Sequence, residues 1–211
     1  MKIKITIAFL AMLHALPSHS QEEPSQFKND IGFNTIFILN ELFDSNATPF
    51  TVMYKKYNSE NKAFRLGLET YIYVGQSSGD GSYTNNDQVN LSLVIGKEWQ
   101  DRLSKSWLWY YGIDIFPSYY FYQLDSYNDD EKLYQDNSSS LALSGRPFLG
   151  IRFDINSRLY ISTEANIAVT YRYSTQKRVS FNPDQTLWDV KSNSVFLNLS
   201  PATGIFLFYR F

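Results

Sequence analysis

Cysteine is absent from the 211-residue sequence, and its two histidines, His14 and His19, both lie within the first 20 residues. A chain without cysteine forms no disulfide, no thiolate metal site and no lipid-modified cysteine. Beyond residue 20 it also lacks the histidine that acts as base in hydrolytic triads and as ligand in most zinc sites. We therefore expect a non-enzymatic protein with no catalytic residues, no cofactor and no metal site.

Positive charge is also scarce. Lys2 and Lys4 account for two of the 19 Lys and Arg residues, so residues 21–211 carry 17 basic against 21 acidic side chains, a net charge of -4. Binding to a phosphate backbone relies on an excess of Lys and Arg. No nucleic-acid partner is expected.

The one long apolar run lies at the N-terminus. Lys2 and Lys4 precede the apolar residues from Ile5 to Leu16, and residues 17–20 supply small side chains before Gln21. This order is typical of a secretory signal peptide, and the run is shorter than the ~20 residues of a helical membrane span. We predict a cleaved signal peptide at 1–20, a polar leader at 21–27 and one folded domain at 28–211.

That domain is rich in residues that favour strands, since the sequence has 16 Tyr, 16 Phe and 4 Trp. Apolar residues recur there at every second position, which is the period of a strand with two unlike faces. In the clearest stretch, 159–173, the odd positions are uncharged and the even positions include Glu164 and Arg172. Eight such stretches are found, at 31–39, 50–57, 64–74, 89–95, 107–115, 146–155, 159–173 and 194–211.

The connections between these stretches alternate in length. Residues 58–61, 100–104 and 156–158 are short turns, whereas residues 41–49, 76–87, 124–137 and 174–191 are long and polar. Short periplasmic turns and long extracellular loops are the pattern of an even-stranded membrane barrel. We predict an all-β fold, an eight-stranded antiparallel up-and-down transmembrane β-barrel, which is too small to be a wide porin.

The two faces of the six clearest strands differ in charge. The apolar face carries no charged residue, as a lipid-facing surface requires, because a mid-bilayer Arg or Lys costs about 2–4 kcal/mol. The opposite face carries both signs, and charges in a narrow lumen must be paired to offset their desolvation. The predicted lumen ion-pair network is Arg65, Glu69, Glu98, Asp114, Arg146, Arg152, Asp154, Glu164, Arg172 and Arg210.

Aromatic residues gather at both ends of the strands. Tyr and Trp settle at both membrane–water boundaries because their rings are apolar and their edges form hydrogen bonds. The predicted belts are Trp99, Trp107 and Trp109 at the short turns, and Tyr119, Tyr120, Tyr122, Tyr171 and Tyr173 at the long loops. The alternation by itself leaves open a soluble periplasmic β-protein, in which the apolar face would be the inside.

The chain resembles the small outer-membrane β-barrel proteins of Gram-negative bacteria, because it ends in Tyr209-Arg210-Phe211. The segments 52–57 and 63–68 look especially like barrel proteins of the Bacteroidota. The resemblance implies that Tyr209 and Phe211 are an assembly signal read by the barrel-assembly machinery. The family usually has glycine five residues before the end, whereas Phe206 stands here and the nearest glycine is Gly204, so recognition would rely on the aromatics.

These observations predict an exported protein of the outer membrane, a monomer surrounded by outer-membrane lipid. Its function would be that of a scaffold that displays four extracellular loops around a lumen filled by side chains such as Phe148, Phe196 and Phe208. A narrow pore or small-ligand transport barrel is the alternative. The sequence does not identify the partner of the loops, and their Asp and Asn residues match no calcium-loop spacing.

Overall fold

The computed structural model describes residues 27–35, 50–79, 81–129, 131–181, 183–201 and 204–211. The expected signal peptide, most of the leader and the first long loop, 41–49, lie outside these residues. Among the described residues, no helix is long and apolar enough to cross a membrane.

The described chain is a single antiparallel sheet. Its strands are β1 (Asn29–Asn34), β2 (Phe50–Ser59), β3 (Lys62–Gly79), β4 (Ser82–Arg102), β5 (Trp107–Asn128), β6 (Glu131–Asp154), β7 (Leu159–Phe181), β8 (Asp184–Ser200) and β9 (Ile205–Arg210). Each strand from β1 to β7 pairs with the next one along the chain, so that the sequential pairing ends with β7 and β8. β9 pairs with both β7 and β1, which closes the sheet on itself.

The closed sheet is a ring of eight strands. β8 and β9 follow one another along the same side of β7, at residues 166–181 and 159–163 respectively, so together they occupy one place in the wall. The prediction of an eight-stranded antiparallel ring is therefore confirmed. Full closure leaves no strand edge at the level of β1, β2 and β9, which satisfies the backbone donors and acceptors there.

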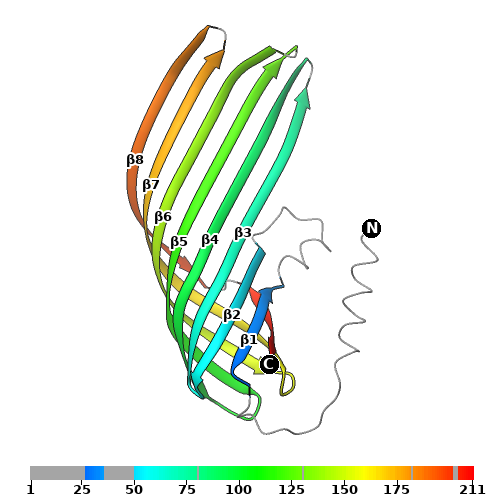
Figure 1. Ribbon diagram of the computed structural model, residues 1–211, viewed down its shortest axis with the longest axis vertical. Helices are drawn as coiled ribbons and strands as arrows, with labels where there is room; N and C mark the ends of the chain where they lie inside the picture. Colours follow the sequence, from blue (N-terminus) through cyan, green and yellow to red (C-terminus); the bar gives the residue numbers. More distant parts are fainter. Residues whose placement is uncertain (1–26, 36–49, 80, 130, 182, 202–203) are drawn as a thin grey trace.

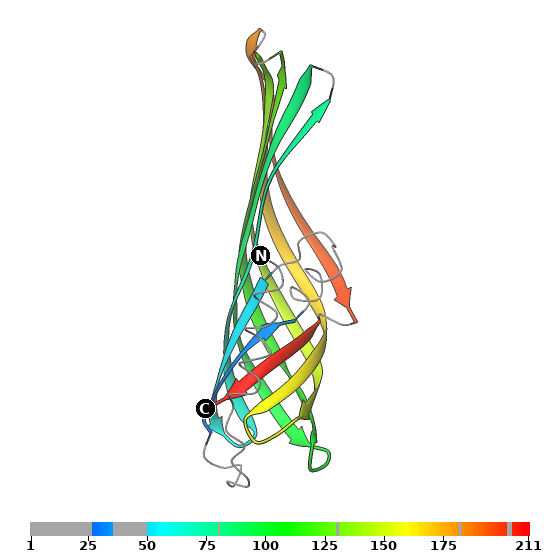
Figure 2. The ribbon, with the colours of Figure 1, turned by 90° about the vertical axis from the view of Figure 1, so that its right-hand side faces the viewer.

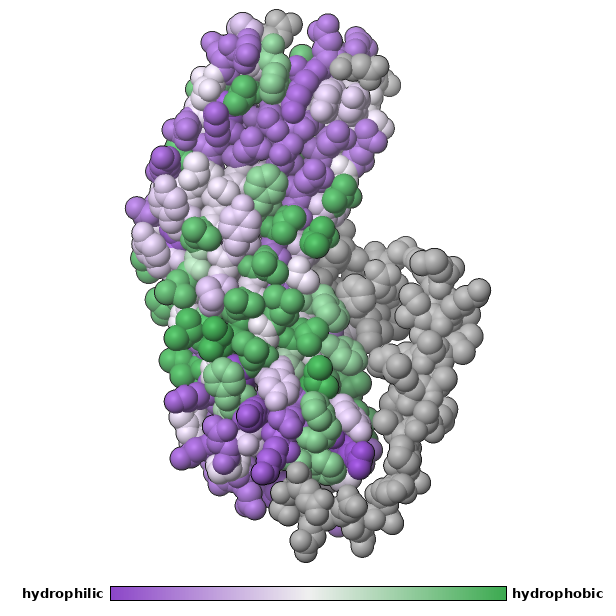
Figure 3. Space-filling model, viewed as in Figure 1, coloured by the Kyte–Doolittle hydropathy of each residue, from purple (hydrophilic) through white to green (hydrophobic). Residues whose placement is uncertain are grey.

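The alternation of the sequence becomes an outside and an inside. In β3, Phe64, Leu66 and Leu68 are exposed on the outer face, whereas the intervening Arg65 and Gly67 are buried. The same inversion holds around the ring, where many large apolar side chains are exposed and many buried ones are charged. Figure 3 shows the result as a hydrophobic band between two hydrophilic ends.

Three of the predicted long loops are wrong. The segments 76–87, 124–137 and 174–191 belong instead to β-hairpins, whose tight turns include Gly81 at φ 71° and Asp129 at φ 48°. Polar residues in a strand bond their backbone to the neighbouring strand as well as apolar ones do, so composition did not separate a solvated strand from a loop. Strands β3 to β8 thus rise as one tall curved sheet beyond the ring (Figures 1 and 2).

The tall part of the sheet has edges, in contrast to the ring. In the part of the chain that the structure describes, residues 71–79 of β3 pair only with β4, and β8 pairs only with β7. The inner face of the sheet therefore continues upward from the bore of the ring without a described wall opposite it.

Candidate functional site: a charge-balanced plug in the bore

The centre of the bore holds a layer of paired charges. Arg65, which is fully buried, lies 3.3 Å from Glu98, 3.5 Å from Asp114 and 3.0 Å from Glu164. Lys55 Nζ is 2.7 Å from Glu98 and Arg146 is 3.3 Å from Asp114. Three cations thus face three carboxylates. Equal charge of each sign offsets much of the large free energy of moving ions out of water.

Aromatic rings hold these cations in place. The guanidinium of Arg65 lies 3.9 Å from the centre of the Phe148 ring. Lys55 Nζ lies 4.7 Å from the Tyr110 ring and 4.6 Å from the Phe208 ring. Cation–π contacts of this kind contribute about 2 kcal/mol when desolvated. The charged layer is therefore packed against ring faces as well as paired.

A second layer of paired charges lies nearer the short turns. Tyr57 and Tyr160 donate hydrogen bonds of 2.7 and 2.5 Å to Asp30. Arg210 approaches Asp30 at 3.6 Å. Arg152 pairs with Asp154 at 2.6 Å, and Arg210 reaches the same carboxylate at 3.6 Å. The half-exposed Arg102 reaches Asp154 at 3.8 Å from the rim. Below this layer a vestibule of about 550 Å³ opens at the mouth of the ring.

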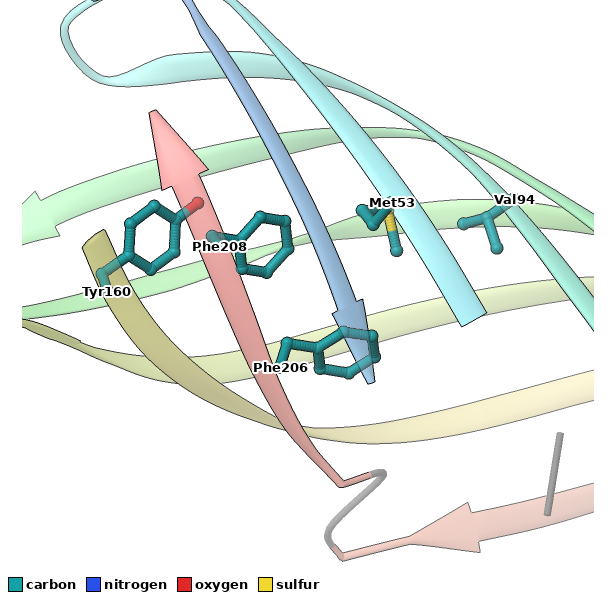
Figure 4. Close-up of a cluster of buried hydrophobic side chains, with 5 residues drawn as sticks. All are labelled: Met53, Val94, Tyr160, Phe206 and Phe208. Atoms are coloured by element: carbon teal, nitrogen blue, oxygen red, sulfur yellow. The ribbon is translucent and has the colours of Figure 1, made fainter. Parts of the chain in front are cut away.

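Apolar side chains fill the space that the charges leave. Met53, Val94, Tyr160, Phe206 and Phe208 form one buried cluster inside the ring (Figure 4). The rings of Tyr160 and Phe208 stack at 4.9 Å. Phe196, which we expected beside them, is half-buried on β8 above the ring. Charged layers and apolar cluster together form what we call the plug.

Glycines on the inner face make room for the plug. A Cβ on Gly150 would lie 2.3 Å from the Tyr110 ring, and one on Gly32 would lie 2.3 Å from the Phe208 ring. Gly145, on the outer face, has nothing within 4 Å of its own Cβ position. Any side chain at the first two positions would displace a ring, so these glycines are part of how a narrow bore accommodates large residues.

The structure places eight of the ten predicted lumen residues in ion pairs: Arg65, Glu98, Asp114, Arg146, Arg152, Asp154, Glu164 and Arg210. Glu69 instead accepts a 3.4 Å hydrogen bond from Thr51. Arg172 is not in the plug. It is exposed, has no ion pair among the described residues and lies over the Phe196 ring at 4.7 Å. The alternation along a strand predicts which face of the wall a side chain lies on, but it does not predict the height of that side chain along the bore.

The alternation pattern did not identify Lys55, Asp30, Tyr57 and Tyr110 as members of the plug. Lys55 lies in a stretch where Lys56 follows directly, so that both faces carried a charge and the alternation was blurred. Asp30 precedes the expected start of its strand by one residue. The alternation places Tyr110 on the inner face, but only its contacts identify its role, since a tyrosine between Trp109 and Tyr111 is also typical of a membrane interface.

The outer surface orders the aromatic residues around the apolar band. Near the short turns, Trp99 stacks on Tyr111 at 5.9 Å and Trp107 lies 4.9 Å from Phe153. Trp109 packs beside Tyr111 at 5.5 Å. On the far side of the band the exposed rings are Tyr119, Tyr171 and Tyr173.

Tyr120 and Tyr122 do not belong to this belt. They alternate with Tyr119 and Phe121 along β5, so their rings lie on the inner face, where both line a cavity. The prediction that placed Tyr119, Tyr120 and Tyr122 on one surface was wrong, because successive residues of a strand point to opposite faces.

The C-terminal strand closes the ring. Phe211 donates its N–H to the carbonyl of Asn29 at 2.8 Å, and the hydroxyl of Tyr209 accepts a 3.2 Å hydrogen bond from Arg158. Both aromatic side chains remain on the outer surface, with ring centres 6.4 Å apart. Their recognition by an assembly machinery stays a prediction.

Within the described ranges, no three Asp, Glu, His or Cys side chains are arranged to hold a metal ion.

No family model and no curated protein sequence matches the chain. Solved structures that resemble it include the ferric yersiniabactin uptake receptor FyuA from Yersinia pestis, with 10% identity and a TM-score of 0.46 over 71% of this chain and 24% of the receptor. The chain thus spans about a quarter of that receptor's length. The attachment invasion locus protein Ail of Yersinia pestis has 14% identity and a TM-score of 0.39, over 89% of this chain and 99% of its own.

CarO from Acinetobacter baumannii has 9% identity and a TM-score of 0.37, over 90% of this chain and 100% of its own. All three are outer-membrane β-barrel proteins of Gram-negative bacteria. Identities and TM-scores this low transfer no ligand and no activity to this chain.

Proposed function

We propose that the chain is a non-enzymatic, integral outer-membrane β-barrel whose bore is closed and whose tall sheet is displayed outside the cell. The observation that supports this most strongly is the inversion of the wall, apolar outside and charge-paired inside. In water, exposed Leu66, Leu93, Ile113 and Leu143 would favour association of the protein. In a bilayer the same residues face hydrocarbon.

The apolar band has the dimensions of a membrane. Tyr111 and Tyr119 mark its two sides on β5, eight residues apart. At about 3.4 Å per residue and a tilt of about 40°, they are separated by about 20 Å along the barrel axis, close to the ~25 Å of an outer-membrane band. Two exposed lysines of the outer face, Lys56 and Lys97, lie at the short-turn side of the band, where a long side chain reaches the boundary.

We also propose how the chain is exported and assembled in the outer membrane. Residues 1–20 would direct export and be removed, Tyr209 and Phe211 would present the last strand to the barrel-assembly machinery, and the barrel would remain a monomer surrounded by lipid. The likeness of 52–57 and 63–68 to barrels of the Bacteroidota supports the proposal that the source is a bacterium of that group.

The closed bore separates this function from that of a narrow transport pore. With three cations against three carboxylates in one layer and aromatic rings between them, the plug leaves little room for hydrated ions. A pore would need a continuous polar path with space for water.

Membrane fractionation and conductance test the proposal. The protein expressed in a Gram-negative host should stay in the outer-membrane pellet after carbonate extraction and should change mobility on a gel after boiling. In planar bilayers the purified protein should show no stable conductance steps. Recovery in the soluble periplasmic fraction would refute the membrane assignment, and stable steps would refute the closed bore.

A further inference from the structure

The tall sheet has a cavity on its inner face, above the plug. It has a volume of about 440 Å³ and lies between strands β5, β6, β7 and β8. Its lining includes Tyr120, Tyr122, Ser138, Arg172, Gln176 and Trp188. Cavities of about 300–1,000 Å³ are the usual size of small-ligand sites. This one would accept one or two sugar-sized rings.

The two arginines that line the cavity differ in whether they form an ion pair. Arg178 donates hydrogen bonds from Nε and Nη2 to the two carboxylate oxygens of Asp136, and these bonds raise the pKa of Arg178 above its ordinary value. Arg172 has no ion pair among the described residues, and its guanidinium lies over the Phe196 ring. A stacked guanidinium keeps its five N–H donors in a fixed plane. Arg172 is therefore oriented and available to an anion.

The remaining lining residues combine flat rings with small polar groups. Tyr122 and Trp188 offer ring faces. The guanidinium of Arg178 lies 5.6 Å from the centre of the Trp188 ring, and this contact restricts the Trp188 side chain. Between them the lining has Asn137, Ser138, Ser140, Ser174 and Gln176. Rings with an apolar body and a polar edge suit the C–H face of a sugar, while hydroxyl and amide groups both donate to and accept from its hydroxyls.

We propose that this cavity binds an acidic saccharide, with its carboxylate on Arg172 and its sugar rings against Tyr122 and Trp188. The combination of an oriented, accessible guanidinium with ring faces and a row of hydroxyls favours this class over a neutral sugar. The proposal rests on the proposed function only for the side of the membrane on which the cavity lies. The purified barrel would bind the ligand wherever it is placed.

The test uses trigalacturonate as the acidic probe and trigalactose as its neutral counterpart. Binding to the purified, folded barrel is followed by the fluorescence of Trp188, with Trp188→Phe as the signal control. Trigalacturonate should bind about tenfold or more tightly than trigalactose, because a charge-assisted hydrogen bond is added. Arg172→Gln should weaken trigalacturonate by about 10- to 100-fold and leave trigalactose unchanged.

Lys177→Gln is the matched control. Lys177 is an exposed cation on the same strand as Arg172, but it is an odd-numbered residue of β7 and therefore lies on the outer face. Lys177→Gln thus removes the same charge as Arg172→Gln, from the face opposite to the cavity. It should change binding by less than about twofold. Equal binding of both probes to the native barrel would overturn the proposal, as would an equal loss from Lys177→Gln and Arg172→Gln.

A second arm asks whether the saccharide is free or presented by a lipid. The same titration is made in nanodiscs with and without a sialic-acid ganglioside. A signal that depends on Arg172 only in ganglioside nanodiscs supports the site with a lipid-linked ligand. No Arg172-dependent binding in either arm overturns it. Heat-modified mobility of each variant shows independently that the barrel is folded, so a failed barrel and a failed site are distinguished.

Discussion

Replacing Arg65 by Met should severely destabilise the barrel. The guanidinium contacts Glu98, Asp114 and Glu164 at 3.0 to 3.5 Å, and all three carboxylates are buried. After Arg65→Met only Lys55 and Arg146 remain to balance them. Removing one partner from a buried ion pair costs about 3–5 kcal/mol, since the remaining charge stays out of water. Met keeps an apolar stem against Phe148, so packing contributes little to the loss.

A second substitution separates charge from packing. Arg65→Met combined with Glu164→Gln restores two cations against two carboxylates in the layer. The double variant should lie within about 2 kcal/mol of the native protein, less destabilised than Arg65→Met alone. Arg65→Lys should fall between them, because an ammonium keeps the charge but not the planar reach to three carboxylates.

Equilibrium urea unfolding in lipid vesicles, followed by tryptophan fluorescence in both directions, gives these free energies. Planar-bilayer recording of Arg65→Met adds an independent readout, because unbalanced carboxylates should draw water and cations into the bore. The electrostatic account of the plug is refuted if Arg65→Met stays within about 0.5 kcal/mol of the native protein, the range of neutral surface changes. It is equally refuted if Glu164→Gln lowers the stability of Arg65→Met further.

Three further changes test the packing, the lipid face and the C-terminus. Gly150→Ala should lower the free energy of unfolding by about 1–3 kcal/mol, because the methyl group displaces the ring beside it, whereas Gly145→Ala should be neutral in the same urea titration. Leu68→Arg, in the apolar band, should cost about 2–4 kcal/mol, while Gln76→Arg on the same outer row, beyond the band, should change stability by less than about 0.5 kcal/mol. Deletion of Phe211 should lower the heat-modifiable fraction in cells, and normal assembly of the deletion would exclude it as a signal.

The ring was predictable from the sequence because the pattern that produces it lies within short stretches of the chain. A two-residue period, repeated eight times with short turns between alternate pairs, fixes both the strand count and the outward face. The same period predicts that Glu98 and Glu164 are inward charges. Partner choice was not predictable, since Arg65 meets Glu164, which is 99 residues away along the chain.

The prediction failed where the local signal was ambiguous. Strand β2 carries Lys55 inward and Lys56 outward, and nothing in the residue types shows which of the two is buried among rings. Similarly, the polar segments at 76–87 and 174–191 fit a loop by composition, yet their backbone pairing continues the strands below them. The composition of a segment indicates whether it is exposed to solvent. The length of a strand depends instead on whether the neighbouring strand extends equally far and can pair with it.

The height of a residue along β7 decides between two roles for the same inner face. Glu164 and Asn166 are buried where the ring is closed, whereas Arg172 is exposed eight residues beyond Glu164, above the described ends of β1, β2 and β9. Where side chains meet an opposite wall they fill the bore, and where the described structure has no such wall they line an open cavity. Two arginines of one face should therefore respond differently. Arg172→Gln should leave the free energy of unfolding within about 0.5 kcal/mol of the native value, although Arg65→Met lowers it by about 3–5 kcal/mol. A loss of similar size from Arg172→Gln would place Arg172 in the plug and leave the cavity without its free cation.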